Sequence, residues 1–299
     1  MDRPKIVTPS TEMAIDYNQY FCGRVFIITG VGRSGTTILG KLIGSMEPAF
    51  YLFEPAIMKY CIWMCIPELA GVLFEDYFLP MVQGRYLNFN EKEDSCIYHY
   101  QGKTFNEFAW NNLNNKKSAL KYIESIPPLW VIKTNEIAPW AKTNYEICFP
   151  GVKFLHIIRN GNDVIGSALQ RGWYSDQYME KEIVDFVSKK ETYNCPWYLS
   201  EEDKQNWRDW NQVTRCACIW RTLVETIPTT LTYESLLEKP ERWVQRFSDE
   251  FNLGITHITG QHIKSIKKHS VKSYPDFLPL IEEPEKGKYQ QTMKKFGYL

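Results

Sequence analysis

The stretch Val25–Gly44, VFIITGVGRSGTTILGKLIG, decides the fold of this chain. Its first five residues, Val25–Thr29, are apolar and mostly β-branched, which predicts a fully buried strand. Glycines punctuate the loop at 30–35, and Thr36 then opens a segment whose apolar residues recur at helical spacing. This order brings unpaired backbone N–H groups and the positive end of a helix dipole to one place. Read alone, the glycines also fit a tight turn, but the whole stretch predicts a site for the phosphates of a nucleotide.

One missing residue narrows the choice of nucleotide. A Walker A loop, G-x-x-x-x-G-K-S/T, needs a lysine for the phosphates and a hydroxyl for Mg²⁺. Gly30 and Gly35 have that spacing, but Thr36 takes the lysine position and Arg33 is the only cation of the loop. The segment 33–37, RSGTT, resembles the 5′-phosphosulfate loop of sulfotransferases that use 3′-phosphoadenosine 5′-phosphosulfate (PAPS). The resemblance implies that Arg33 binds the 5′-phosphate and that neighbouring amides and hydroxyls complete the cradle: Gly32, Ser34, Gly35, Thr36 and Thr37.

A second anion site is predicted after a later strand, expected at 152–158. Arg159 follows that strand, and Ser167 lies eight residues on, about two turns along the next helix. A lone arginine before a helix also fits a structural salt bridge. Together with the Arg33 loop, however, this pair resembles the 3′-phosphate motif of the same family, in which an Arg and a Ser at this spacing bind that phosphate. Asn160 or Asn162 is the expected N-cap of the helix.

Two further segments carry the resemblance toward the end of the chain. Residues 233–236, YESL, resemble the family's Tyr-Glu-Asp-Leu segment, which implies that Tyr233 lies near the adenosine; Ser235 departs from the pattern. Residues 293–298, MKKFGY, resemble the ending of many bacterial members.

Sulfuryl transfer requires a general base for the acceptor and cations for the developing charge. Residues 133–135, KTN, occupy the place of the Lys-Thr-His segment in phenol and steroid sulfotransferases, where the His is the base and the Lys stabilises the sulfuryl group. Asn135 stands in the histidine position, and an amide cannot act as a base near neutral pH. The resemblance therefore leaves Lys133, together with Arg33, to stabilise charge.

Glu54 is the predicted base. It ends an apolar run at 49–53 and lies 17 residues after Thr37, which resembles the loop-to-Glu spacing of tyrosylprotein sulfotransferases. The following Pro55 makes a Glu-Pro pair, as in some carbohydrate sulfotransferases. By position alone, Glu54 fits a solvated loop carboxylate equally well. His99 is the second candidate for the base, whereas His156 falls inside a predicted strand and is expected in the core.

The order of segments predicts an α/β fold with a mainly parallel sheet, in a single domain over residues 1–299. Five expected strands alternate with helices: 25–29, 49–53, 129–132, 152–158 and 229–232. The resemblance specifies the P-loop-NTPase-like sulfotransferase fold with helical cap segments. Residues 1–20 are a polar lead-in, and 56–128 and 173–210 are expected caps on the acceptor side, with irregular chain at 77–100. The second cap has nine acidic and five basic residues and reads as a lid more than as sheet.

Composition limits the partners. The chain has 35 basic and 35 acidic residues, so net charge gives no steering toward nucleic acid or a membrane. The eight cysteines form no C-x-x-C pair, which favours free buried thiols over a metal site. No signal peptide and no long apolar run is present, so a cytoplasmic protein is expected. An N-terminal anchor outside the sequence given, as in Golgi sulfotransferases, stays open, as does the oligomeric state.

The sequence thus favours a PAPS-dependent sulfotransferase that needs no metal and acts on a small molecule. The expected acceptor group is a hydroxyl or an amine or amide nitrogen, on a natural-product-like compound such as an alkaloid. One alternative is a P-loop nucleotide or small-molecule kinase. Others are a carbohydrate or protein-tyrosine sulfotransferase, and a regulatory module that binds the nucleotide without catalysis.

Overall fold

The computed structural model describes part of the chain. The described residues are 22–53, 96–100, 103–104, 129–134, 139–180, 187–190, 193–196, 198–226, 228, 231–268 and 274–299. The expected lead-in at 1–20 and most of the expected cap at 56–128 therefore lie outside the described residues.

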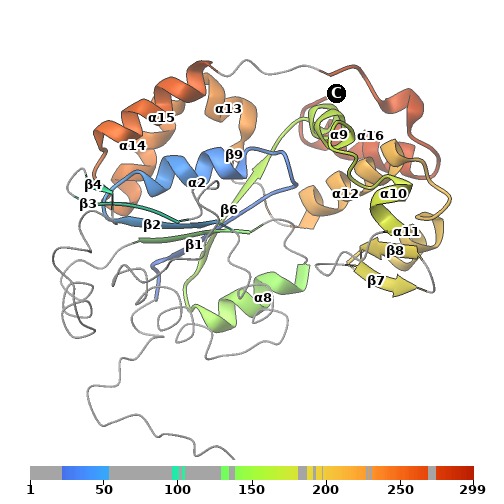
Figure 1. The fold of residues 1–299 in the computed structure, drawn as a ribbon, viewed down its shortest axis with the longest axis horizontal. Coiled ribbons are helices and arrows are strands. Elements are labelled where there is room, and N and C mark those ends of the chain that lie inside the picture. The colour runs from blue at the N-terminus through green and yellow to red at the C-terminus, as the bar shows by residue number, and fades with distance from the viewer. Residues whose placement is uncertain are drawn as a thin grey trace, which may run out of the picture.

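A seven-stranded sheet with the order β4-β3-β2-β5-β1-β6-β9 forms the centre of the fold (Figure 1). Five neighbouring strands are parallel: β2, Ala49–Phe53; β5, Leu129–Lys133; β1, Val25–Thr29; β6, Lys153–Ile158; and β9, Leu231–Thr232. Every residue of β1 and β5 is buried, as the continuous apolar runs predict. The structure confirms the mainly parallel α/β sheet and all five predicted strands.

One edge of the sheet differs from the sequence prediction. The strand β3, Cys96–Tyr100, pairs antiparallel with β2, and β4, Lys103–Thr104, pairs antiparallel with β3. The prediction of irregular chain over 77–100 is therefore wrong for residues 96–100. Ile97 and His99 alternate with tyrosines, which is a strand pattern. The many aromatic residues of the whole segment made this alternation hard to distinguish.

Helices cover both faces of the parallel strands. Figure 1 shows α2, Thr36–Gly44, α14, Pro240–Phe251, and α15, His257–Lys268, over one face, with α8, Pro139–Cys148, over the other. A buried cluster joins the first group to the sheet; within it, Phe26 of β1 makes edge contacts with Phe247 and Phe251 of α14. Packing of this kind fixes the sheet beneath α2, so the loop before α2 rests on a rigid support.

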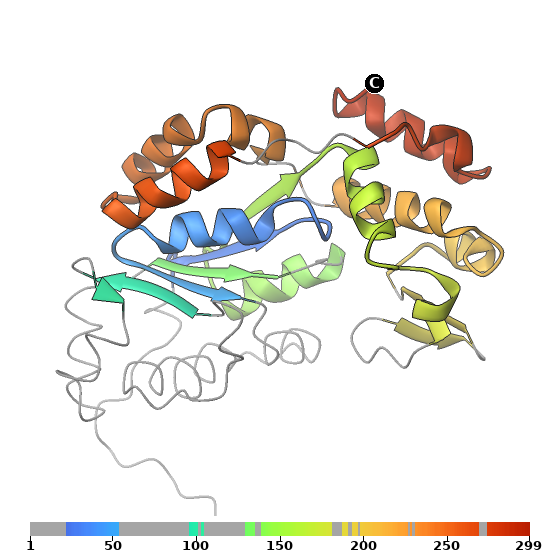
Figure 2. The same cartoon turned by 45° about the horizontal axis from the view of Figure 1, so that its top comes forward.

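A second group of helices packs beyond the end of β6 that leads into α9 (Figure 2). It contains α9, Gly161–Leu169; α10, Asp176–Glu180; α11, Glu201–Asn206; α12, Gln212–Thr226; and α16, Glu285–Lys295. Trp207 and Trp220 are fully buried in its core. The remaining short elements are α13, Tyr233–Glu238, and a 3₁₀ turn, Leu278–Leu280.

The cap predicted at 173–210 contains a sheet element. Strands β7, Val187–Lys190, and β8, Tyr193–Pro196, form an antiparallel hairpin between α10 and α11. The interpretation of this segment as a lid more than as sheet is wrong for these two strands, because their polar residues give no apolar alternation. The assignment of both caps to the acceptor side, and of the whole chain to one domain, stays a prediction.

Four of the cysteines whose burial the structure describes are buried, as expected: Cys148, Cys195, Cys216 and Cys218. Cys22 is exposed, which differs from the expectation. Burial raises the pKa of Cys216 to about 12, with the charge of Arg215 opposing it. A thiol with that pKa is inert near neutral pH. None of the described helices combines the length and the hydropathy that a membrane span requires.

Candidate functional site

Parallel strands present their carboxyl ends at one edge of the sheet, where open α/β folds bind ligands. The loop 30–35 follows β1, Lys133 is the last residue of β5, Arg159 follows β6 and Tyr233 follows β9. Glu54 follows β2 in the chain but lies outside the described residues. The topology therefore brings the sequence-predicted residues of four strands to one edge.

Two residues at the end of the loop after β1 have the left-handed backbone conformation, directly before the helix α2 begins. Arg33 has φ 77° and Gly35 has φ 94°, and α2 then begins at Thr36. Within the described chain, the start of α2 has neither an acidic residue in its first turn nor a side-chain cap. The N–H groups of this turn and the helix dipole are therefore available to an anion. Ser34 adds a hydroxyl that is fully buried and has no hydrogen-bond partner among the described residues.

Two aromatic rings enclose the loop, which explains two of its glycines. A Cβ on Gly35 would lie 2.4 Å from the ring of Tyr233, and one on Gly32 would lie 2.6 Å from the ring of Trp173. Neither position accepts a side chain unless the ring moves. Tyr233 thus contacts the loop directly.

The two predicted phosphate motifs are in direct contact. Nε of Arg33 donates a hydrogen bond of 3.0 Å to Oγ of Ser167, although 134 residues separate the two. Nη1 of Arg159 is 3.4 Å from the carbonyl oxygen of Arg33, and its guanidinium lies 4.8 Å from the centroid of the Tyr233 ring. Asp163 holds the other end of the guanidinium through Nη2 at 3.2 Å. The Arg33 loop and the Arg159 motif therefore form one site.

The site carries excess positive charge. Burial lowers the pKa of Arg33, and the guanidinium groups of Arg171 and Arg159 lower it further. Repulsion among these three cations is relieved when an anion lies between them. Nε of Arg159 is also buried without a hydrogen-bond partner in the described chain. The combination of crowded guanidiniums and unsatisfied donors is typical of a phosphate site.

Arg171 and Trp173 are residues that the sequence analysis missed. Both follow α9, and Arg171 lies in the turn after the helix, four residues after Ser167. That spacing was the available signal for Arg171. Trp173 had none, because its contact with Gly32 joins residues far apart in the chain.

The catalytic candidates are placed only in part. Lys133 is 3% exposed, and its backbone pairs with that of Phe53, the residue before Glu54. Glu54 and Asn135 lie outside the described residues. His99 belongs to β3, the second strand from the edge, three strands away from β1, and is paired in register with Thr104. His156 is buried within β6, as its position in a strand predicted.

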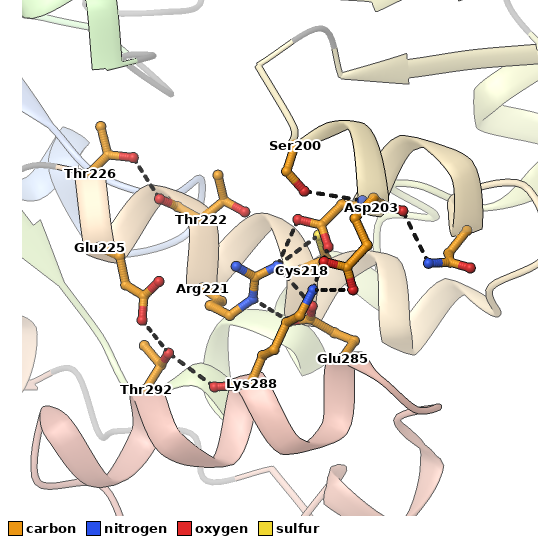
Figure 3. Close-up of polar contacts among 12 residues, drawn as sticks. Ser200, Asp203, Cys218, Arg221, Thr222, Glu225, Thr226, Glu285, Lys288 and Thr292 are labelled. Atoms are coloured by element: carbon orange, nitrogen blue, oxygen red, sulfur yellow. Dashed lines mark hydrogen bonds and ion pairs between the residues drawn. The ribbon is translucent and has the colours of Figure 1, made fainter.

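A second polar cluster lies away from this site, between α11, α12 and α16 (Figure 3). Arg221 donates to both carboxylate oxygens of Glu285, at 2.8 and 2.9 Å, and to Asp203 at 2.9 Å. Lys288 contacts Asp203 at 3.2 Å. Asp203, Cys218 and Glu285 come within 4.8 Å of one another, as metal ligands do. Because Arg221 and Lys288 already neutralise both carboxylates, we assign this cluster as an ion-pair network that joins the three helices.

Comparison with known proteins identifies solved structures of related arrangement. The chain matches no protein-family model and no curated protein. The sulfotransferase domain from the curacin biosynthetic pathway aligns at 16% identity over 93% of this chain and 98% of that one, with a TM-score of 0.48. The sulfotransferase STF9 from Mycobacterium avium aligns at 12% identity over 92% of this chain and 77% of that one, with a TM-score of 0.45. The sulfotransferase domain of the olefin synthase of Synechococcus PCC 7002 aligns at 12% identity over 92% and 94%, with a TM-score of 0.40.

Proposed function

We propose that the chain is a PAPS-dependent sulfotransferase. The observation that carries the proposal is the single cationic site formed by the Arg33 loop and the Arg159 motif, in which Arg33 contacts Ser167. A nucleotide with phosphates at both its 5′ and 3′ positions matches a site built from two phosphate motifs. In this proposal Arg33 and the first turn of α2 hold the 5′-phosphate, Arg159 and Ser167 hold the 3′-phosphate, and Tyr233 contacts the adenosine.

The residues present fit this nucleotide better than they fit ATP with magnesium. The buried hydroxyl of Ser34 and Nε of Arg159 lack hydrogen-bond partners in the described chain, so each has a donor to offer a phosphate. Thr36, buried at the first position of α2, stands where a Walker loop has its lysine. When bound, PAPS supplies an activated sulfuryl group, so the reaction asks the protein for positioning, a base and cations.

The chain's own residues would act at the carboxyl ends of β2 and β5. We propose that Glu54 takes the proton from the acceptor hydroxyl or nitrogen. Lys133, which ends β5 beside Phe53, would stabilise the negative charge that develops during transfer. Arg33 would also contribute positive charge, and His99 remains the second candidate for the base. The buried cysteines fit a reducing compartment, so we place the enzyme in the cytoplasm.

The cofactor assignment is tested by two arginine variants. Arg33→Ala and Arg159→Ala should each weaken the binding of adenosine 3′,5′-bisphosphate, measured by calorimetry. A lost charged hydrogen bond costs about 1.5–3 kcal/mol, which is more than about tenfold in affinity. Arg242→Ala, at an exposed arginine of α14, is the matched control and should bind like the parent chain. Unchanged affinity in both site variants would remove the basis of the proposal.

A metal test separates this proposal from the kinase alternative. Turnover with PAPS should survive the removal of divalent cations by a chelator. ATP-dependent phosphorylation that stops on chelation would favour the kinase instead.

The acceptor class is a further proposal. The cap at 173–210 is rich in aromatic residues and has four more acidic than basic residues, which disfavours a long polyanionic glycan. A compact aromatic acceptor, polar or cationic and natural-product-like, fits such a surface. We expect sulfation of small phenols, alcohols or amines in a panel read by mass spectrometry. Sulfation of a heparan-type polymer, or of peptide tyrosine, with none of the small acceptors would contradict this expectation.

A further inference from the structure

Glu234 joins α13 to two segments that are distant in the sequence. Its Oε1 accepts a hydrogen bond of 2.9 Å from the backbone N–H of Asn160. Its Oε2 accepts a hydrogen bond of 3.0 Å from the hydroxyl of Tyr298, which follows α16. A carboxylate that accepts one bond at each oxygen links the segment after α16 to the loop after β6.

The loop held in this way is the one that presents Arg159. Asn160 follows Arg159 directly, and its side chain caps α9 by accepting a hydrogen bond of 2.9 Å from the N–H of Asn162. On the other side of the peptide, the indole N–H of Trp220 donates to the carbonyl oxygen of Arg159 at 3.0 Å. Glu234 and Trp220 therefore hold the backbone on both sides of the Arg159–Asn160 peptide bond.

Tyr298 is itself fixed in place. Its backbone N–H donates to the carbonyl oxygen of Met293 at 2.9 Å, through a turn in which Gly297 has φ 75°. Its ring lies 6.5 Å from that of Trp220 in an edge contact. Burial, and then the charge of Glu234, raise the pKa of Tyr298, so the hydroxyl keeps its proton and donates at ordinary pH. The donor that holds Glu234 is thus a rigid one.

We propose that Tyr298 and Glu234 are positioning residues that set the affinity of the site for the 3′-phosphate by holding the Arg159–Asn160 backbone. The inference rests on the proposed function, which places Arg159 at that phosphate. Neither residue needs to contact the nucleotide. Both carboxylate oxygens of Glu234 accept hydrogen bonds, one from the N–H of Asn160 and one from the hydroxyl of Tyr298. These two donors offset the negative charge that would otherwise repel the incoming anion.

The experiment compares two ligands that differ only in the 3′-phosphate. The affinities of adenosine 3′,5′-bisphosphate and adenosine 5′-monophosphate are measured by calorimetry for each chain. Tyr298→Phe, which removes one hydroxyl, should weaken bisphosphate binding about three- to tenfold, the effect of one hydrogen bond. The affinity for the monophosphate should change by less than about twofold, because this ligand has no 3′-phosphate to contact Arg159.

Two other variants show whether Tyr298 acts through Glu234. Glu234→Ala should reduce the preference for the bisphosphate in the same direction. Tyr298→Phe in that background should add little, because residues in one network are not additive. Thr292→Val is the matched control, since it deletes a buried hydroxyl of α16 that donates to Glu225 at 2.6 Å, away from the loop. It should leave the ratio of the two affinities unchanged.

The outcomes separate this inference from the proposed function. A parent chain that binds both ligands equally would overturn the proposed function and this inference with it. A parent chain that prefers the bisphosphate, with the same preference in Tyr298→Phe and Glu234→Ala, would overturn this inference alone. Equal weakening of both ligands in Tyr298→Phe would show that the hydroxyl only supports the fold.

Discussion

A Glu54→Gln chain should transfer sulfuryl groups roughly 10²–10⁴ times more slowly than the parent, the contribution of a positioned general base. The amide keeps the shape of the side chain but cannot accept the proton of the acceptor. Phe53, the residue before Glu54 in the chain, pairs with Lys133, whose side chain is buried. Rapid-quench measurement of kcat with saturating PAPS tests the expectation, and the affinity for adenosine 3′,5′-bisphosphate should be nearly unchanged.

The matched control for this variant lies at the other end of the same strand. Glu47 precedes β2 and is held by backbone hydrogen bonds with Gly254, so Glu47→Gln should keep full activity. Asn135→Ala should do less harm than Glu54→Gln, and His99→Ala less still. If Glu54→Gln turns over normally while His99→Ala is inactive, the base is His99.

Acceptor acidity gives an independent measure of the same step. A nitrophenol loses its proton readily, so its sulfation needs less help from a base than the sulfation of an alkyl alcohol. The rate loss in Glu54→Gln should therefore be smaller for the nitrophenol. An equal loss with both acceptors would indicate that Glu54 positions the acceptor without accepting its proton.

The parts of the fold that the sequence predicts are those that local patterns encode. Val25–Thr29 is predicted as a buried strand because five apolar or β-branched residues lie between polar segments. Asn160 or Asn162 is predicted as the helix cap because an amide there can accept a hydrogen bond from the first turn, and in the structure Asn160 does so. Residues that follow parallel strands are predicted to lie close together because the carboxyl ends of all parallel strands are on the same side of the sheet.

The remaining features depend on contacts between distant segments. The hydrogen bond from Arg33 to Ser167, the ring of Trp173 over Gly32, and the bond from Tyr298 to Glu234 each join different elements of the fold. No local pattern encodes such a contact. The strands β7 and β8 were not predicted for a related reason. They pair through their backbones, and their sequences lack the apolar alternation by which a strand is recognised.

The largest stability effect is expected from Arg221→Met, which removes the centre of the cluster in Figure 3. Arg221 pairs with both Glu285, which is fully buried, and Asp203, whose side chain is 3% exposed. The substitution therefore leaves two buried carboxylates without their principal cation. Breaking a buried ion pair by deleting one partner costs about 3–5 kcal/mol. Urea unfolding should show this loss as a lower midpoint with an unchanged slope. The matched control is Lys142→Met, whose pair with Glu146 is exposed and should cost less than about 1 kcal/mol.

The loss in Arg221→Met should also depend on pH, with a sign that identifies the cause. Without the guanidinium, two buried carboxylates lie close together, and among the ion pairs of the described residues Lys288 contacts only one of them, Asp203. At least one of the two should therefore have a pKa raised above its unfolded value. A carboxyl with a raised folded pKa favours the folded state fully below its unfolded pKa and loses that contribution as pH rises through the folded pKa. The variant should therefore lie closest to the parent chain in mildly acidic buffer and fall further behind toward pH about 8. A gap in the free energy of unfolding that stays constant across this range would mean that Arg221 stabilises the helices by packing, through its buried stem, instead of by neutralising Asp203 and Glu285.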